Sequence, residues 1–407
     1  MPSVLFVSPG YPAEMPHFVR GLAEVGATIL GLGDQPQGLL PAAVRHLLTG
    51  YLRVRSLWDE AAVVAAARDW LGSRRVDRVE CLWEPGMILA AHLREGLGTA
   101  GLSVAATLPL RNKELMKRAL DAAGIRTPRH RAARGEVEIR AAAESLGYPL
   151  IVKPIAGAGS ADTHRVEAPA ELEPVIAATR HVPEVSVEEF VDGEEYTFDT
   201  VSIGGVPAYF NVAWYRPRPL VARTNEWISP QVVALRHPDR QGLAAGVEMG
   251  RRVLATLGFE SGFTHMEWYL KADGEVVFGE IGGRPPGAHQ VDQMNYAGDI
   301  DVFRGWAEAV CFGRFSEPPR RLYNVATVYK RAEGQGVIRR IAGLEEFRRR
   351  WGNEPIVWEN LLPPGSPRRN WRQTLVSDGF VVVRHPELAI TLEMADELGR
   401  DVRLFAA

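Results

Sequence analysis

The chain has 407 residues, of which 46% are hydrophobic and 24% charged, and its formal net charge is −3. This composition is ordinary for a globular protein with a large core, and it supplies no basic field for nucleic acid or a membrane surface. The sequence holds two cysteines, Cys81 and Cys311, which argues against a disulfide framework or a zinc cage and favours a reducing, cytoplasmic compartment. The opening stretch lacks a basic region followed by a long apolar run, so we expect neither a signal peptide nor a transmembrane helix.

The first part of the chain alternates strand and helix patterns. We expect strands at 3–8, 28–33 and 76–83 and helices at 15–26 and 58–75. Such alternation predicts a parallel sheet covered by helices. The dinucleotide fingerprint GxGxxG is missing from this part.

The pattern changes after residue 112, where a helix stops at Gly124. The next stretch, to about residue 190, reads as a small α+β unit, and strands dominate from there onward. We therefore predict an α/β and α+β protein with four parts. The parts are 1–105, an N-terminal α/β domain; 106–190, a linker helix and small lid; 191–317, a larger α+β domain; and 318–407, a C-terminal extension of that domain.

A hairpin pattern in 264–289, "THMEWYLKADGEVVFGEIGGRPPGAH", raises a chemical question. A two-residue turn at Asp273-Gly274 would set Ala272 opposite Glu275 and Glu267 opposite Glu280. Two facing carboxylates destabilise a hairpin unless they point into water, share a proton or share a cation. An exposed hairpin with both side chains in water is therefore the alternative to a binding site.

The residues around this hairpin favour a cation bound to phosphate. The stretch after Glu280, "IGGRPPGAH", lets the backbone approach a ligand and carries Arg284. Mg²⁺ takes one or two protein carboxylates and fills its remaining positions with phosphate and water oxygens. Lys153, at the end of an apolar strand, precedes the glycine-rich turn 157–160, whose backbone N–H groups could cover phosphates. A plain flexible turn is the alternative for that segment.

Rival nucleotide and hydrolase motifs are missing from the sequence. It contains no Gly-Lys dipeptide and hence no P-loop. The HExxH and GxSxG patterns and the EF-hand loop are also missing.

The ordered set of Lys113, "IVKPIAGAGS", "VEEFVDGEEYT", Glu267 and "GEIGGRP" resembles the ATP-grasp superfamily. The resemblance spans about 105–300. It implies an ATP site clamped between a small α+β lid and a larger α+β domain, with residues 1–105 similar to the usual N-terminal domain.

The resemblance implies a role for each matching residue. Those expected to bind ATP are Lys113 and Lys153 at the phosphates, Gly157, Gly159 and Ser160 in the loop over them, Glu188 near the adenine amino group, Phe190 and Val191 at the ring, and Glu195 at the ribose hydroxyls.

The resemblance also assigns the metal and the chemistry. Glu267 and Glu280 are expected to hold Mg²⁺ or Mn²⁺, and Arg284 and Lys153 to be catalytic. Gly282 stands where many members carry an asparagine that is a further metal ligand, which leaves the number of metal ions open.

The implied reaction is a carboxylate–amine ligation through an acylphosphate, and the "EIGGRP" form is most similar to the amino-acid ligases. The expected partners are a small carboxylate and an amine, and analogy to the superfamily adds a homodimer. Candidate substrate residues are Arg223, Glu226, His289 and Asn295, for which plain loop surface is the alternative. Two other functions stay open: a carboxylation of the biotin-carboxylase or purine-pathway kind, and an ATP-binding module without ligase activity.

Overall fold

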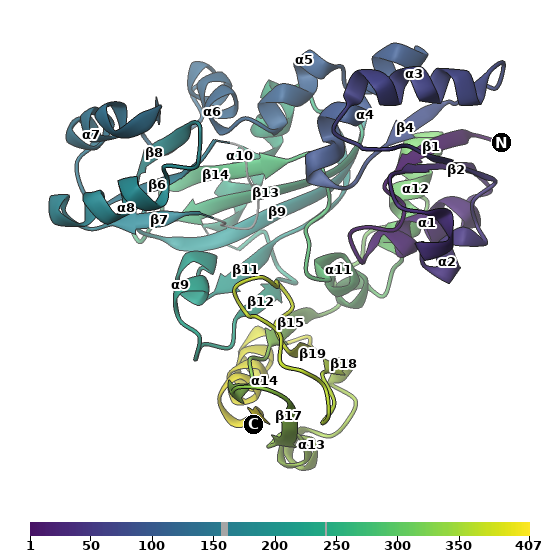
Figure 1. Ribbon diagram of the computed structural model, residues 1–407. Helices are drawn as coiled ribbons and strands as arrows, with labels where there is room; N and C mark the ends of the chain where they lie inside the picture. Colours follow the sequence, from purple (N-terminus) through teal and green to yellow (C-terminus); the bar gives the residue numbers. More distant parts are fainter. Residues whose placement is uncertain (156–161, 241) are drawn as a thin grey trace.

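A computed structural model describes residues 1–155, 162–240 and 242–407 of this protein. Within these ranges the strands form four sheets, and the large sheet occupies the centre of the molecule (Figure 1). The expected combination of a parallel α/β part with α+β parts is confirmed. None of the helices in the described ranges is both long enough and apolar enough to span a membrane.

The N-terminal part is a parallel sheet with helices packed on it, as its alternating pattern predicts. Its strands run in the order β3 (Gly50–Arg53), β2 (Thr28–Gly33), β1 (Ser3–Val7) and β4 (Arg78–Glu80). Its helices are α1 (Met15–Glu24), α2 (Ala42–Arg45), α3 (Glu60–Leu71) and α4 (Met87–Leu97). Helix α3 begins where the Asp59 side chain accepts from the Ala62 N–H at 3.2 Å, a standard N-cap.

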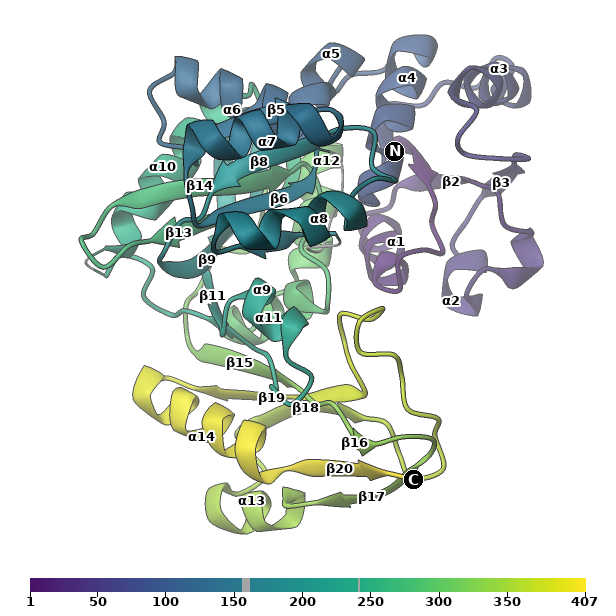
Figure 2. The same cartoon turned by 60° about the vertical axis from the view of Figure 1, so that its left-hand side comes forward.

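A small antiparallel sheet, called the lid sheet below, forms the second unit. Its strand order is β5 (His130–Ala133), β8 (Val185–Glu189), β6 (Leu150–Pro154) and β7 (His164–Val166). Helices α7 (Gly135–Leu146) and α8 (Leu172–Ala178) cover one face of this sheet through apolar side chains (Figure 2). Helices α5 (Val104–Thr107) and α6 (Lys113–Ala122) lead into it from the N-terminal part.

The large sheet is mainly antiparallel. Its order is β14 (Val276–Gly282), β13 (Gly262–Leu270), β9 (Glu194–Ile203), β11 (Ala213–Arg216), β12 (Gln231–Ala234), β15 (Asn324–Tyr329), β19 (Gly379–His385) and β18 (Ile356–Leu361), with β10 (Val206–Asn211) also paired to β9. Its helices are α9 (Pro219–Thr224), α10 (Leu243–Thr256), α11 (Gln290–Gly298), α12 (Val302–Phe312) and α14 (Leu388–Asp401).

Close helix–sheet contact explains two glycines of α10. A Cβ at Gly246 would lie 2.2 Å from the Trp268 ring, and one at Gly250 would lie 2.3 Å from the Phe198 ring. These glycines let α10 lie directly on β9 and β13, which buries the apolar face of the strands that carry the site.

The division into four parts stays a prediction. Strands from 318–407 continue the large sheet, and the same segment forms the small sheet β16 (Glu333–Gly334), β20 (Arg403–Ala406) and β17 (Ile338–Ala342), next to α13 (Leu344–Trp351). Helix α12 packs against α1, and one apolar cluster joins the N-terminal sheet to the large sheet.

Candidate active site

Glu267 and Glu280 face each other across the β13–β14 hairpin, so the predicted pairing is confirmed. The predicted two-residue turn is wrong. The Lys271 N–H donates to the Glu275 carbonyl at 2.9 Å, which makes Lys271 rather than Ala272 the partner of Glu275. Three residues therefore form the turn, and its last one, Gly274, has a φ of 89° that glycine adopts without strain.

A bulge at Gly279 restores the pairing of the two acids. Near the turn Trp268 faces Phe278, whereas one step further Glu267 faces Glu280, so Gly279 is an extra residue in β14. A Cβ at Gly279 would lie 2.7 Å from the Glu267 carbonyl oxygen. Glycine at this position thus permits the bulge, and the bulge sets the carboxylates opposite each other.

A pocket between the lid sheet and the hairpin brings together most of the residues predicted to bind ATP and the metal ion. The predicted residues that line it are Lys113, Lys153, Glu188, Phe190, Val191, Glu195, Glu267 and Glu280. Gly157, Gly159 and Ser160 lie outside the described residues. The lysines and acids of this group come from elements far apart in the sequence, namely α6, β6, β8, β9 and the hairpin.

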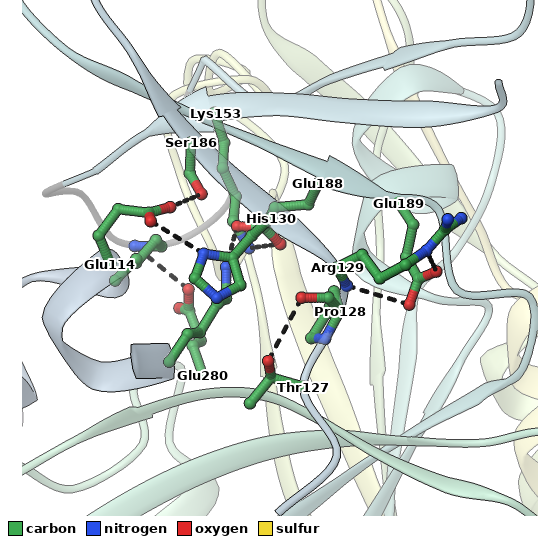
Figure 3. A network of polar contacts seen from close by, with 12 residues as sticks. Glu114, Thr127, Pro128, Arg129, His130, Lys153, Ser186, Glu188, Glu189 and Glu280 are labelled. Atoms are coloured by element: carbon green, nitrogen blue, oxygen red, sulfur yellow. Dashed lines mark hydrogen bonds and ion pairs between the residues drawn. The ribbon is translucent and has the colours of Figure 1, made fainter. Parts of the chain in front are cut away.

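Glu188 lies between two lysines. Its Oε2 is 3.0 Å from Lys153 Nζ (Figure 3). Its Oε1 contacts Nζ of Lys117, which is fully buried. Burial opposes the Glu188 charge, but the two lysine charges outweigh it and lower the pKa of Glu188 to about 2. The Glu188 carboxylate, expected near the adenine amino group, therefore holds two lysines in place.

Lys117 was not among the predicted site residues. Burial lowers its pKa to about 8 despite the Glu188 carboxylate. Lys117 lies four residues after Lys113, and this spacing puts both side chains on one face of α6. This spacing could have identified Lys117 as a further site residue.

Glu280 is held by a lysine of α6, the helix that leads into the lid sheet. Its Oε2 lies 3.2 Å from Lys113 Nζ. Burial opposes the Glu280 charge, but the charges of Lys113 and Lys153 prevail and lower its pKa to about 2. The Glu280 carboxylate thus stays ionised beside the two lysines.

Glu267 is held from within the large sheet. Its Oε1 lies 3.4 Å from His265 Nε2 and accepts from the Tyr215 hydroxyl at 3.4 Å. His265 Nδ1 is bonded to the buried Asp199 at 2.6 Å. Burial opposes protonation of His265, but the Asp199 carboxylate raises its pKa to about 9.

Arg218 organises the part of the pocket expected to hold the nucleoside. Its guanidinium donates to the Val191 carbonyl at 2.7 Å, lies 3.3 Å from Glu195 Oε2 and stacks over the rings of Phe190 and Tyr269. Burial, followed by the charge of Glu267, raises the pKa of Glu195 to about 8. Arg218 lies between Pro217 and Pro219 in no recognisable motif, so no local pattern pointed to it.

Arg284 contacts the N-terminal part of the molecule. Its guanidinium lies 2.9 Å from Glu84 Oε2, and Arg111 contacts the other oxygen of the same carboxylate. Burial opposes the Arg284 charge, but Glu84, with help from Glu267 and Glu280, raises its pKa. Glu84 follows strand β4, and ligands of open α/β sheets gather at such carboxyl ends. This rule could have identified it.

A second polar network joins α6 to the lid sheet (Figure 3). Glu114 on α6 accepts from the Ser186 hydroxyl at 2.6 Å and lies 2.8 Å from His130 Nδ1. Burial opposes the Glu114 charge, but the bonds from His130 and Ser186 lower its pKa. Since α6 carries Lys113 and Lys117, this network fixes the lysines relative to the lid.

The candidate substrate residues do not line this pocket. Arg223 lies 3.5 Å from the Arg372 carbonyl and Glu226 contacts Arg368. Asn295 Oδ1 accepts from the Val302 N–H at 2.9 Å, at the start of α12. The His289 ring packs between Asp292 and the rings of Trp358 and Phe380. Their substrate roles stay predictions.

The donor set at the hairpin fits Mg²⁺. Carboxylate oxygens are its preferred protein ligands, and it commonly takes two of them together with phosphate and water. Among the described residues no group of three or more His, Cys, Asp or Glu side chains is arranged as a metal cage. A cation at Glu267 and Glu280 would therefore need oxygens from phosphate and water.

The chain is similar to a known domain family and to curated proteins. Residues 118–291 match the family model described as "ATP-grasp domain". The chain is 26% identical over 260 residues to alanine–anticapsin ligase of Bacillus subtilis, which covers 58% of this chain and 54% of that protein. The chain spans about half the length of the curated relatives it matches.

Solved structures share the fold over the whole chain. An L-amino acid ligase from Bacillus licheniformis superimposes with a TM-score of 0.80 at 19% identity, covering 100% of this chain and 99% of that one. N5-carboxyaminoimidazole ribonucleotide synthetase from Thermotoga maritima gives a TM-score of 0.72 at 15% identity, with 100% of both chains covered. The resemblance read from the sequence is thus confirmed: this chain carries an ATP-grasp domain, within a whole-chain fold shared with these two enzymes.

Proposed function

We propose that this protein is an ATP-dependent carboxylate–amine ligase that joins an amino acid or another small carboxylate to an amine and releases ADP and phosphate. The observation that carries the proposal is the convergence of Lys113, Lys153 and the facing pair Glu267 and Glu280 on one pocket. Cations and paired acids in this arrangement suit a triphosphate with its metal ion. The names of the matched ligases support an amino acid as the carboxylate.

The first step activates the acid. An oxygen of the substrate carboxylate attacks the γ-phosphorus of ATP, the bond between that phosphorus and the bridging oxygen breaks, and ADP leaves with the bonding electrons. Lys153 is held by Glu188, and Lys113 by Glu280, so both ammonium groups face the pocket before nucleotide binds. Their charges stabilise the negative charge that spreads over the phosphoryl oxygens.

Mg²⁺ or Mn²⁺, when bound by Glu267 and Glu280, would neutralise phosphate charge during transfer. The glutamates are suited to this task because the hairpin fixes them opposite each other and Glu280 stays ionised.

The second step forms the amide. The amine nitrogen attacks the acyl carbon, a C–N bond forms, the acyl C–O bond breaks, and phosphate leaves while the nitrogen loses a proton. Arg284, fixed by Glu84, supplies a guanidinium that stabilises the oxyanion of the tetrahedral intermediate.

Phosphate release under defined combinations of substrates tests the proposal. The full-length protein is incubated with ATP, Mg²⁺ and free amino acids, which supply both groups. N-blocked amino acids, which supply only the acid, and amino-acid amides or simple amines, which supply only the amine, are then tested alone and together. We expect ADP and phosphate to form only when an acid and an amine are both present, and mass spectrometry to detect the amide.

Two results would contradict the ligase. Phosphate release that depends on bicarbonate instead of an amine would establish a carboxylation. Nucleotide binding with no turnover in any combination would indicate a binding module.

A further inference from the structure

A buried hydrogen-bonded pair, Asp199 and His265, lies behind Glu267, the glutamate proposed to bind the cation. Asp199 on β9 and His265 on β13 are direct partners in the strand register, and Asp199 Oδ1 lies 2.6 Å from His265 Nδ1. Asp199 is fully buried and His265 is 7% exposed. Burying polar side chains costs free energy that their mutual hydrogen bond only partly offsets. Stability alone therefore does not account for this pair.

The other ring nitrogen of His265 contacts Glu267. His265 and Glu267 are two residues apart on β13, which places their side chains on the same face of the strand. His265 Nε2 lies 3.4 Å from Glu267 Oε1, and the Tyr215 hydroxyl reaches the same oxygen at 3.4 Å. Both contacts hold Oε1 of Glu267, a residue that lines the pocket.

Asp199 is itself fixed by neighbouring strands. Its Oδ2 accepts from the Thr197 hydroxyl at 2.7 Å and from the Asn211 amide at 3.4 Å. The Thr197 oxygen in turn accepts from the Ala213 N–H at 3.1 Å. The carboxylate that contacts His265 is thus linked by hydrogen bonds to strands β9, β10 and β11 of the large sheet.

We propose that Asp199 and His265 are positioning residues that hold the Glu267 carboxylate in the orientation needed to bind the cation. This inference rests on the proposed function, because it concerns the metal site of that function. Hydrogen-bonded partners behind a metal ligand orient it, and their loss typically weakens metal binding about 10–100-fold.

Two substitutions of His265 separate its two contacts. Asparagine places its amide nitrogen where Nδ1 lies, so His265→Asn keeps the bond to Asp199 and loses the contact with Glu267. Glutamine places its amide nitrogen where Nε2 lies, so His265→Gln keeps a donor for Glu267. Asp199→Asn removes the charge that orients His265. Thr200→Val is the matched control, since Thr200 is also buried on β9 but bonds to Ser202 and Thr264 instead.

The affinity for Mn²⁺ is the measurement, because it needs no turnover. Electron paramagnetic resonance of the full-length protein with a non-hydrolysable ATP analogue gives the dissociation constant, and circular dichroism establishes that each variant is folded. We expect His265→Asn to weaken Mn²⁺ binding about 10–100-fold, Asp199→Asn to weaken it about 10-fold, and His265→Gln and Thr200→Val to stay within about 3-fold of wild type.

The outcomes distinguish this inference from the proposed function. A wild-type protein that binds no Mn²⁺ with the nucleotide would overturn the metal site of the proposed function and the inference with it. Normal binding by the wild type together with equal affinities for His265→Asn and wild type, or equal losses for His265→Asn and His265→Gln, would overturn the inference alone. If Asp199→Asn does not fold, the two His265 variants decide.

Discussion

The two acids that face each other across the β13–β14 hairpin are held in different ways. Glu280 lies 3.2 Å from Lys113, a residue of the helix that leads into the lid. Glu267 is held by His265 and Tyr215, which belong to the large sheet that carries the acid itself. One carboxylate thus depends on ion pairs between separate elements, and the other on contacts within one sheet.

This difference predicts which substitutions should affect each of the two glutamates. Lys113 and Lys117 lie on α6, and α6 is joined to the lid sheet by the contacts of Glu188 and Glu114. Substitutions of the lysines on α6 or of their carboxylate partners should therefore change both the charge of the pocket and the free energy of unfolding. Substitutions behind Glu267 should change the orientation of one ligand while most of the fold is kept.

Replacing Glu280 should have the largest effect. Glu280→Gln removes a proposed metal ligand and the carboxylate charge 3.2 Å from Lys113, so we expect ligase turnover to fall at least about 100-fold. Turnover is measured as ADP formation with saturating ATP and Mg²⁺. The control is Glu275→Gln on the same hairpin, which contacts Lys271 and Arg126 outside the pocket and should keep near-normal turnover. A near-normal rate for Glu280→Gln would show that the metal assignment is wrong.

Removing the buried Lys117 should destabilise the protein. Lys117→Met leaves one oxygen of the buried Glu188 without its cation, and breaking such a pair costs about 3 kcal/mol in the free energy of unfolding. Urea denaturation measures the loss. In a Glu188→Gln background the same substitution should cost clearly less, because the partner charge is gone. Equal losses in both backgrounds would mean that the pair contributes nothing.

Filling the bulge should disturb both acids at once. A Cβ at Gly279 would lie 2.7 Å from the Glu267 backbone oxygen, so we expect Gly279→Ala to cost about 1–3 kcal/mol in the free energy of unfolding and to lower turnover. The comparison is Gly38→Ala, where a Cβ meets no atom within 4 Å. Unchanged stability and turnover for Gly279→Ala would mean that the bulge does not set the pairing.

Low pH should lower the free energy of unfolding, because Glu188 in the lid sheet becomes protonated. The folded-state pKa of Glu188 is lowered to about 2 from its ordinary 4.5. A lowered acid pKa stabilises the fold above the ordinary value, and this stability is lost as the pH falls from about 4.5 toward 2. By pH 3.5 we expect wild type to lose about 1.4 kcal/mol more than Glu188→Gln, relative to pH 7. If wild type and Glu188→Gln lose the same free energy of unfolding between pH 7 and pH 3.5, this prediction is wrong.

Local sequence patterns were sufficient for much of the fold. The alternation at the start predicts the parallel sheet of β1, β2 and β4, and the Gly124 stop predicts the end of α6. The order of motifs around Lys153 and Glu267 predicts an ATP-grasp domain, which the match over 118–291 confirms.

Other features depend on contacts between distant segments. The pairing of Glu267 with Glu280 was predicted from the wrong turn, because the larger turn and the Gly279 bulge offset each other by one residue. Arg218 and Asp199 were missed, since their partners lie on other strands and no local spacing points to them. Burial of Lys117 depends on Glu188, which lies 71 residues further along the chain.

Diffraction from a crystal of the full-length protein with Mn²⁺ and a non-hydrolysable ATP analogue would locate the cation by its anomalous signal. We expect an anomalous peak in contact with oxygens of Glu267, Glu280 and the terminal phosphates, with Lys113 and Lys153 beside them. Bound nucleotide with both carboxylates turned to solvent, and the metal ion held elsewhere, would contradict it.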